Sequence, residues 1–210
     1  MTSKLSLYNG ALQMLGERRL AALTEDRGSR RDLDAGYDDV VLRCLEAGYW
    51  KFAMRTVQID AATDLAPTFG YTKIFVKPAD MLRLYMISAS ERFDPPLDDY
   101  QDEQGYWYCD TDPIYVRYVS SAADLGLNLA TWSPCFCTFV EGALALRICK
   151  VTTNSATDVE VLKKDVHRLK TDARAKEAMK DPSRRPPMGT WANSRSGGWT
   201  GASRWNRTFR

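Results

Sequence analysis

Carboxylates are the side chains of this 210-residue chain whose spacing could most directly support catalysis. Six of them lie between positions 91 and 103: Glu91, Asp94, Asp98, Asp99, Asp102 and Glu103. Two carboxylates can act as acid and nucleophile in glycoside hydrolysis. A run this polar is more typical of a solvated loop, which is our interpretation. If the loop has a function, we expect it to line a pore or to meet a neighbouring assembly, through Asp98, Asp99, Asp102 and Glu103.

Other reactive side chains are scattered along the chain. Glu141 lies inside the apolar stretch 134–149, surroundings that could raise the pKa of a catalytic carboxyl. The single histidine, His167, has no serine or cysteine partner in any motif, which favours a packing or surface role. Cys135 and Cys137 would point about 200° apart on a helix, a poor geometry for sharing a metal. We therefore expect no cofactor, no metal and no enzymatic activity.

Composition limits the class of protein. The chain is 44% hydrophobic and 27% charged, ordinary values for a globular protein. Its five cysteines form no disulfide framework and indicate small buried side chains in a reducing compartment. No stretch resembles a signal peptide or a membrane span. The net charge of +2 is uneven, with −3 over residues 1–180 and +5 over 181–210.

Apolar periodicity predicts four helices, over residues 3–15, 29–49, 133–150 and 157–180. We expect Ser3 and Ser29 to cap the first two, and Gly16 to end the first. Ser133-Pro134 should begin the third, which is apolar on several sides and therefore central. Thr157-x-x-Glu160 has the pattern of a capping box for the fourth.

Residues 51–120 alternate in polarity and contain Pro-, Gly- and Asp-bearing turns, which predicts a small antiparallel β region. The fold class is therefore mainly α with a small antiparallel β region (α+β), a helical bundle with inserted β-hairpins. Trp50 and Phe52 should anchor the two parts to each other. We expect one domain over residues 1–180 and an extended tail over 181–210.

The tail is rich in Pro, Gly, Ser and Arg but also contains three tryptophans, which is unusual for a disordered terminus. Trp and Arg are the residues that most often anchor interfaces. Docking on a protein partner is the favoured interpretation; a solvated terminus and binding of single-stranded nucleic acid are the alternatives. The residues expected to dock are Arg184, Arg185, Trp191, Arg195, Trp199 and Trp205.

An ordered series of segments resembles a known family. Residues 9–20, Asn-Gly-Ala-Leu-Gln-Met-Leu-Gly-Glu-Arg-Arg-Leu, resemble the opening of phage tail tubular protein A and related head-to-tail adaptors. Residues 50–53, Trp-Lys-Phe-Ala, extend the match, although the family usually has Asn where Lys51 stands. Residues 76–83 resemble its Pro-x-Asp-x-x-Arg segment and 114–118 a later strand. Residues 191–195 are similar to a Trp-x-x-x-Arg signature near its C-terminus.

The resemblance covers roughly residues 5–195 and implies a structural subunit. Such a protein would form a homo-oligomeric ring of about twelve copies. The ring would contact the portal protein and the next tail protein, which is a nozzle, tail tube or terminator. It would sit at the head–tail junction of the virion after assembly in the host cytoplasm. The tail residues would bind the portal, and DNA would pass without specific binding along an acidic channel.

Two functions of other classes remain as alternatives. A virion-associated peptidoglycan hydrolase would use Glu141 as its acid. A nucleic-acid-binding protein would use the basic tail, with affinity that falls steeply as salt rises; the charge of −3 over residues 1–180 argues against it.

Overall fold

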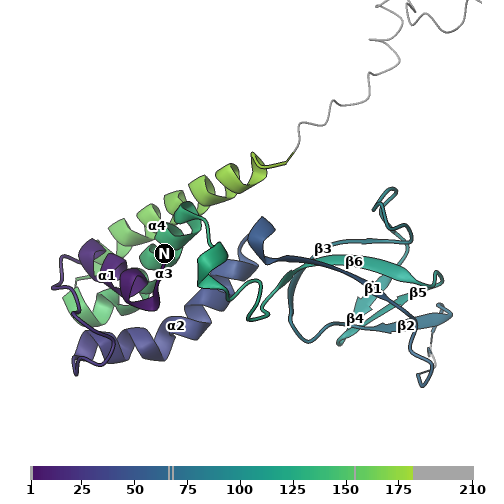
Figure 1. Ribbon diagram of the computed structural model, residues 1–210, viewed down its shortest axis with the longest axis horizontal. Coiled ribbons are helices and arrows are strands. Elements are labelled where there is room, and N and C mark those ends of the chain that lie inside the picture. Colours follow the sequence, from purple (N-terminus) through teal and green to yellow (C-terminus); the bar gives the residue numbers. More distant parts are fainter. Residues whose placement is uncertain (1, 66, 68, 154, 182–210) are drawn as a thin grey trace, which may run out of the picture. The chain divides into compact units, whose positions relative to one another are not determined.

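The computed structural model describes residues 2–65, 67, 69–153 and 155–181 (Figure 1). The chain divides into two compact units, Met1–Met179 and Lys180–Arg210, and the helices and strands given below belong to the first. Within the described residues, two α-helices precede six strands and two more α-helices follow them. This order confirms an α+β fold with the β part inserted between helices.

The helical part consists of α1 (Lys4–Met14), α2 (Gly28–Glu46), α3 (Pro134–Thr153) and α4 (Ala156–Ala178). The helix α3 contacts each of the other three, as its apolar sequence predicted (Figure 1). Its buried side chains join those of α1 and α2 in one apolar core that also takes in Trp50. The core members of α3 include Phe136, Val140, Leu144 and Ile148.

The helix ends agree with the sequence in three places. Ser3 caps α1 in a capping box, because its hydroxyl accepts the Ser6 N–H while the Ser6 hydroxyl accepts the Ser3 N–H. Gly16 follows α1 with a φ of +71°, a conformation that glycine adopts without strain. Pro134 is the first residue of α3, and the Ser133 hydroxyl accepts the Phe136 N–H at 3.4 Å.

Two predicted caps are wrong. The helix α2 begins at Gly28, before Ser29, and its N-cap residue Arg27 makes no side-chain capping bond. The helix α4 is capped by Ser155, whose hydroxyl accepts the Asp158 N–H at 3.2 Å. Thr157 already lies inside that helix. Ser155 takes the capping role because it precedes the first helical residue and can reach the N–H three residues on.

The β part contains two antiparallel three-stranded sheets. One has the order β1 (Met54–Ile59), β6 (Ile114–Ser120), β3 (Met81–Ser88), and the other β2 (Lys73–Val76), β5 (Tyr106–Cys109), β4 (Gln101–Glu103). Side chains of both sheets share a second, smaller core. Residues 51–53, predicted as strand, form a 3-10 helix instead, so β1 begins only at Met54.

Trp50 lies where the helical part gives way to the β part, and it is fully buried. Its indole N–H donates to the Cys44 carbonyl at 2.9 Å, and its ring packs 4.8 Å from that of Phe136. Phe52 packs on the same Phe136 ring at 5.0 Å. The two aromatic residues therefore fix the first strand to the helical core, the anchoring role that the sequence indicated.

Candidate functional site

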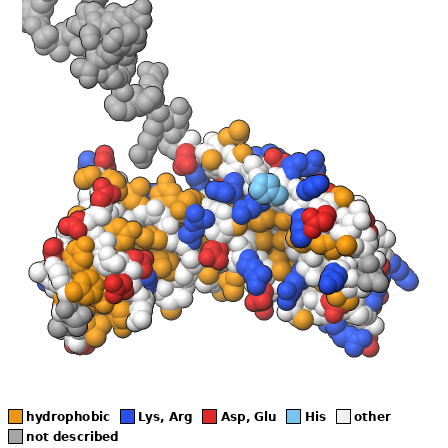
Figure 2. Space-filling model, turned by 180° about the vertical axis from the view of Figure 1, so that it is seen from behind, with side chains coloured by type: hydrophobic (Ala, Val, Ile, Leu, Met, Phe, Trp, Pro, Cys, Tyr) orange, Lys and Arg blue, Asp and Glu red, His pale blue; other side chains and the backbone are white. Residues whose placement is uncertain are grey.

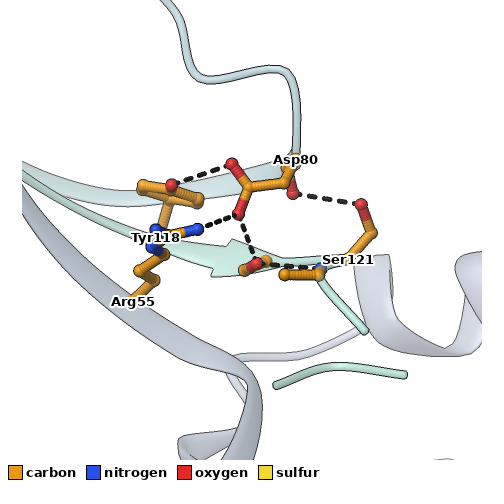
Figure 3. A network of polar contacts seen from close by, with 6 residues as sticks. Arg55, Asp80, Tyr118 and Ser121 are labelled. Atoms are coloured by element: carbon orange, nitrogen blue, oxygen red, sulfur yellow. Dashed lines mark hydrogen bonds and ion pairs between the residues drawn. The ribbon is translucent and has the colours of Figure 1, made fainter. Parts of the chain in front are cut away.

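The polar centre of the β part is Asp80, which directly precedes β3 and hydrogen-bonds to residues of β1 and β6 (Figure 3). Its carboxylate accepts hydrogen bonds from the Tyr118 hydroxyl at 3.0 Å, from the Ser120 hydroxyl, and from the Arg55 guanidinium at 3.1 Å. Its backbone carbonyl accepts the Ser121 N–H at 2.8 Å. Asp80 thus ties β1 and β6 to the start of β3.

The electrostatics of Asp80 suit a structural role. Burial by itself would raise the pKa of this carboxyl, but the bonds from Ser120, Tyr118 and Arg55 outweigh it and hold the pKa below its usual range. Burial and the bond to Asp80 raise the pKa of Tyr118 to about 12. A carboxylate held ionised by three donors is a weak base, which suits a network that fixes geometry.

Arg83 continues the connection from the β part to the helical part. Its guanidinium donates a hydrogen bond of 3.1 Å to the backbone carbonyl of Glu46, which is the last residue of α2. The same guanidinium lies 4.3 Å from the centre of the Tyr49 ring. Tyr49 in turn meets Tyr85 of β3 edge to face, with 5.0 Å between ring centres. Asp80 and Arg83 are three residues apart. We call these two residues and their bonded partners the joint.

A second polar contact lies in the helical part. Asn9 of α1 binds the backbone of Leu20 twice, accepting its N–H at 2.7 Å and donating to its carbonyl at 3.1 Å. This pair of bonds holds the connector between α1 and α2 against α1. Leu20 itself is buried in the helical core. The segment 9–20 is therefore closed on itself by bonds between its first and last residues.

Glu141 lies between two packed helices. A methyl group at Gly10 of α1 would come within 2.3 Å of the Glu141 carboxyl carbon, so the glycine is what lets the carboxylate fit. Burial raises the pKa of Glu141, as the hydrolase alternative requires. Among the described residues no hydrogen bond or ion pair to this carboxylate is found, including none from Arg147. Its position against α1 is that of a packing residue.

The remaining reactive residues do not assemble into a site. His167 is exposed on α4, and its backbone carbonyl accepts the Thr171 hydroxyl. Cys137 is buried, whereas Cys135 is half-buried with its sulfur 3.2 Å from the Lys176 ammonium, so Cys135 is not the fully buried residue we expected. In the part of the chain that the structure describes, no cluster of His, Cys, Asp and Glu could hold a metal. No helix of that part is long and apolar enough to cross a membrane.

Asp98 and Asp99 precede β4 and Asp102 and Glu103 lie on it, but the structure gives these four carboxylates different roles. Asp102 on β4 pairs with Lys77 and accepts the Trp107 indole N–H at 3.1 Å. Asp99 accepts the Tyr71 hydroxyl at 3.0 Å. Asp98 and Glu103 are exposed, and neither forms a hydrogen bond or ion pair within the described residues. Two of the four carboxylates therefore stabilise the fold and two remain available to a partner.

The predicted docking residues of the tail, Arg184, Arg185, Trp191, Arg195, Trp199 and Trp205, lie outside the described residues. Asp80 and Arg83 lie in the segment 76–83, which the sequence analysis singled out, although nothing in the sequence showed which residues they bind.

Comparison with models of protein families gives no match, and a search of curated proteins finds no relative of the chain.

Proposed function

We propose that the chain is a structural head-to-tail adaptor of a tailed bacteriophage. It would be a non-catalytic subunit of a ring of about twelve copies that connects the portal to the tail and continues the DNA channel. The observation that carries the proposal is the joint. Asp80 and Arg83, the acidic and basic residues of the Pro-x-Asp-x-x-Arg segment, bind the β part together and attach it to the end of α2.

A connector needs such a joint because it must hold two partners in a fixed register. Its work is to present one surface to the portal and another to the tail, and a hinge between them would let the two drift apart. The Asp80 carboxylate is satisfied by several donors, and the Arg83 contact combines a hydrogen bond with a cation–π contact. Because several contacts fix the same two residues, they favour a single arrangement of the β part relative to α2.

The basic tail would supply the contact with the portal. Its ordering on the portal would lose conformational entropy and gain buried tryptophan area and charged hydrogen bonds. A portal of rotational symmetry offers the same surface many times, so that many weak contacts add up to stable binding. The next tail protein would find its surface only after the ring had formed, which would set the order of assembly.

Electron microscopy of the purified protein mixed with its cognate portal tests the proposal. We expect a ring of added density on the narrow end of the portal, with the copy number given by the symmetry. A truncated chain lacking residues 181–210 should stay folded and should not load, and the full chain with Lys163→Ala serves as a matched control that should load normally. Absence of added density with the full chain, well above micromolar concentration, would contradict the proposal.

The hydrolase alternative has one observation in its favour, the raised pKa of Glu141. A zymogram of the purified protein on peptidoglycan addresses it. A clear band that disappears with Glu141→Gln would replace the adaptor proposal with a lytic function. We expect no band from either protein.

A further inference from the structure

A groove of about 410 Å³ lies on the helical part between α2, α3 and α4. Its walls are apolar. They are built from Val40 and Cys44 of α2, Phe139, Ala143 and Leu146 of α3, and Val166 of α4. Because three helices contribute to it, the groove is a feature of the folded bundle that no single segment of the sequence could indicate.

Three cations line this groove: Arg43, Arg147 and Lys170. Arg43 and Arg147 are exposed, and within the described residues none of the three forms an ion pair. Arg27 and Arg30, by contrast, pair with Glu17 and Asp34. Over the helical part, on the right in Figure 2, Lys and Arg side chains gather around hydrophobic surface. An apolar groove with unpaired cations is suited to a segment that is both acidic and partly apolar.

The rim charge distinguishes this groove from a second hollow on the helical part. That hollow has a volume of about 200 Å³, is lined by Met14 and Leu162, and carries Asp158 and Asp165 at its edge. An acidic segment would be repelled there and attracted to the first groove. The two hollows therefore select partners of opposite charge.

The chain itself contains a segment of the required charge. Residues 54–120 carry eleven acidic and six basic residues, a formal net charge of −5. Within them the Asp98 and Glu103 carboxylates are exposed and make no ion pair among the described residues, whereas the neighbouring Leu97 and Tyr100 are half-buried against the chain's own second core. The acidic loop thus offers carboxylates that complement the cations of the groove, and the exposed parts of Leu97 and Tyr100 beside them can meet its apolar walls.

We propose that the groove bounded by Arg43, Arg147 and Lys170 receives the acidic loop, Asp98 to Glu103, of a second copy of this chain. This inference rests on the proposed function, since it assigns the contact between neighbours in the ring. Groove and loop are different surfaces, so the contact is heterologous: each copy gives its loop to one neighbour and its groove to the other. Such contacts form a closed ring or an open filament, and the symmetry of the portal selects the ring.

The contact should be weak between two free copies. A stable interface buries about 800 Å² on each partner, and a groove of this size offers only part of that area. Exposed charges at its edge are screened by salt. The free protein should therefore stay largely monomeric, and the contact should become populated when many copies are gathered on one template.

Zero-length carbodiimide crosslinking of rings on the portal tests the contact directly, because it joins a lysine to a carboxylate that touches it. A mixture of ¹⁴N- and ¹⁵N-labelled copies identifies crosslinks between subunits by mass spectrometry. We expect Lys170 to be joined to Asp98 or Glu103 of a differently labelled copy. The Lys163–Glu160 pair, 2.7 Å apart within α4, should be joined within one copy and reports that the reaction worked.

Charge reversal gives an independent test. Arg43→Glu with Arg147→Glu, and separately Asp98→Lys with Glu103→Lys, should each lower the crosslink and the ring yield at least about tenfold, since like charges would meet. In the chain that carries all four substitutions, the charges of groove and loop are exchanged, so its copies should again form the crosslink and the ring with one another. Lys163→Glu with Arg168→Glu, at exposed positions of α4, is the matched control that should behave as wild type.

The outcomes separate this inference from the proposed function. Rings that form on the portal without the Lys170 crosslink, or that tolerate either reversed pair, would overturn the groove contact and leave the adaptor proposal standing. If no ring forms on the portal at all, the adaptor proposal fails. The groove contact is then tested without the portal, by crosslinking at high protein concentration and low salt. Absence of the crosslink from Lys170 to Asp98 or Glu103 of another copy would overturn the groove contact.

Discussion

The helical part and the β part are stabilised by different interactions. The helical part has one large apolar core arranged around α3. The β part has a small core, centred on Phe75, Trp107 and Tyr118, and adds carboxylates that accept hydrogen bonds across its loops. Asp110 accepts the Thr72 N–H at 2.8 Å, and Asp112 accepts the Ala61 N–H at 3.2 Å. Part of the acidic character of the β part is therefore structural, and only the remainder is available to partners.

The largest loss of stability is expected from a substitution in the helical core. Phe136→Ala should lower the free energy of unfolding by about 4 kcal/mol, because the ring packs against Trp50, Phe52 and Trp132 and its loss leaves a cavity. Denaturant unfolding followed by far-UV circular dichroism measures the change. Phe69→Ala, on a side chain of the β part that is 39% exposed, is the matched control and should change stability far less. Equal losses of stability in the two variants would contradict the difference between the helical core and the β part.

The next effect concerns the polar centre of the β part. Asp80→Ala should cost about 2–3 kcal/mol, since Tyr118 and Ser120 would keep partly buried hydroxyls without their acceptor. Amide hydrogen exchange should show the loss of protection concentrated in β1, β3 and β6. Asp124→Ala, at an exposed position, should leave exchange unchanged. Protection lost first in α1 and α4 would mean that Asp80 does not act within its own sheet.

The same carboxylate gives a pH signature. Because the folded pKa of Asp80 lies below its usual range, its contribution to stability is complete above the unfolded value of about 3.9 and is lost as the pH falls through the folded value. Asp80→Asn should remove that component, so the difference between wild type and variant should shrink as the pH is lowered below about 4. A difference independent of pH would contradict the ionised network.

A smaller effect is expected at the contact between the parts. Arg83→Ala should cost about 1 kcal/mol through loss of the bond to the Glu46 carbonyl and the contact with Tyr49. A double-mutant cycle with Tyr49→Leu isolates the ring contact, which should account for about half of that value. Coupling near zero would mean that the stacked geometry contributes nothing in solution.

The smallest effect is at the tight approach of α1 to α3. Burial raises the folded pKa of Glu141, so stability falls as the pH rises from the unfolded value of about 4.3 through the folded one, and the cost persists at neutral pH. Glu141→Gln should therefore raise the melting temperature slightly at pH 7 and leave it unchanged near pH 3. A lowered melting temperature at pH 7 would indicate that the charge is stabilised by its surroundings.

Local sequence signals predicted the elements well and their contacts poorly. Apolar periodicity identified all four helices, and Ser3 and Gly16 marked the ends of α1, because these signals depend on neighbouring residues. The start of α4 was misplaced because Ser155 and Thr157 are both chemically able to cap, and only the backbone decides between them. The rim of the groove combines Arg43 of α2 with Arg147 and Lys170, which follow the whole β part in the chain, so no local pattern could reveal the three together.

The central helix of the bundle is also the third in chain order, and this has a consequence for synthesis on the ribosome. The helices α1 and α2 emerge first, but they cannot bury their apolar faces until α3, which ends at Thr153, has left the exit tunnel. The β strands are complete by Ser120, so their pairing partners are all available earlier. We expect the inserted strands to pair before the helical bundle closes in the nascent chain. The apolar faces of α1 and α2 then remain exposed for the time needed to translate roughly a hundred residues, which makes this interval the one in which a chaperone would bind.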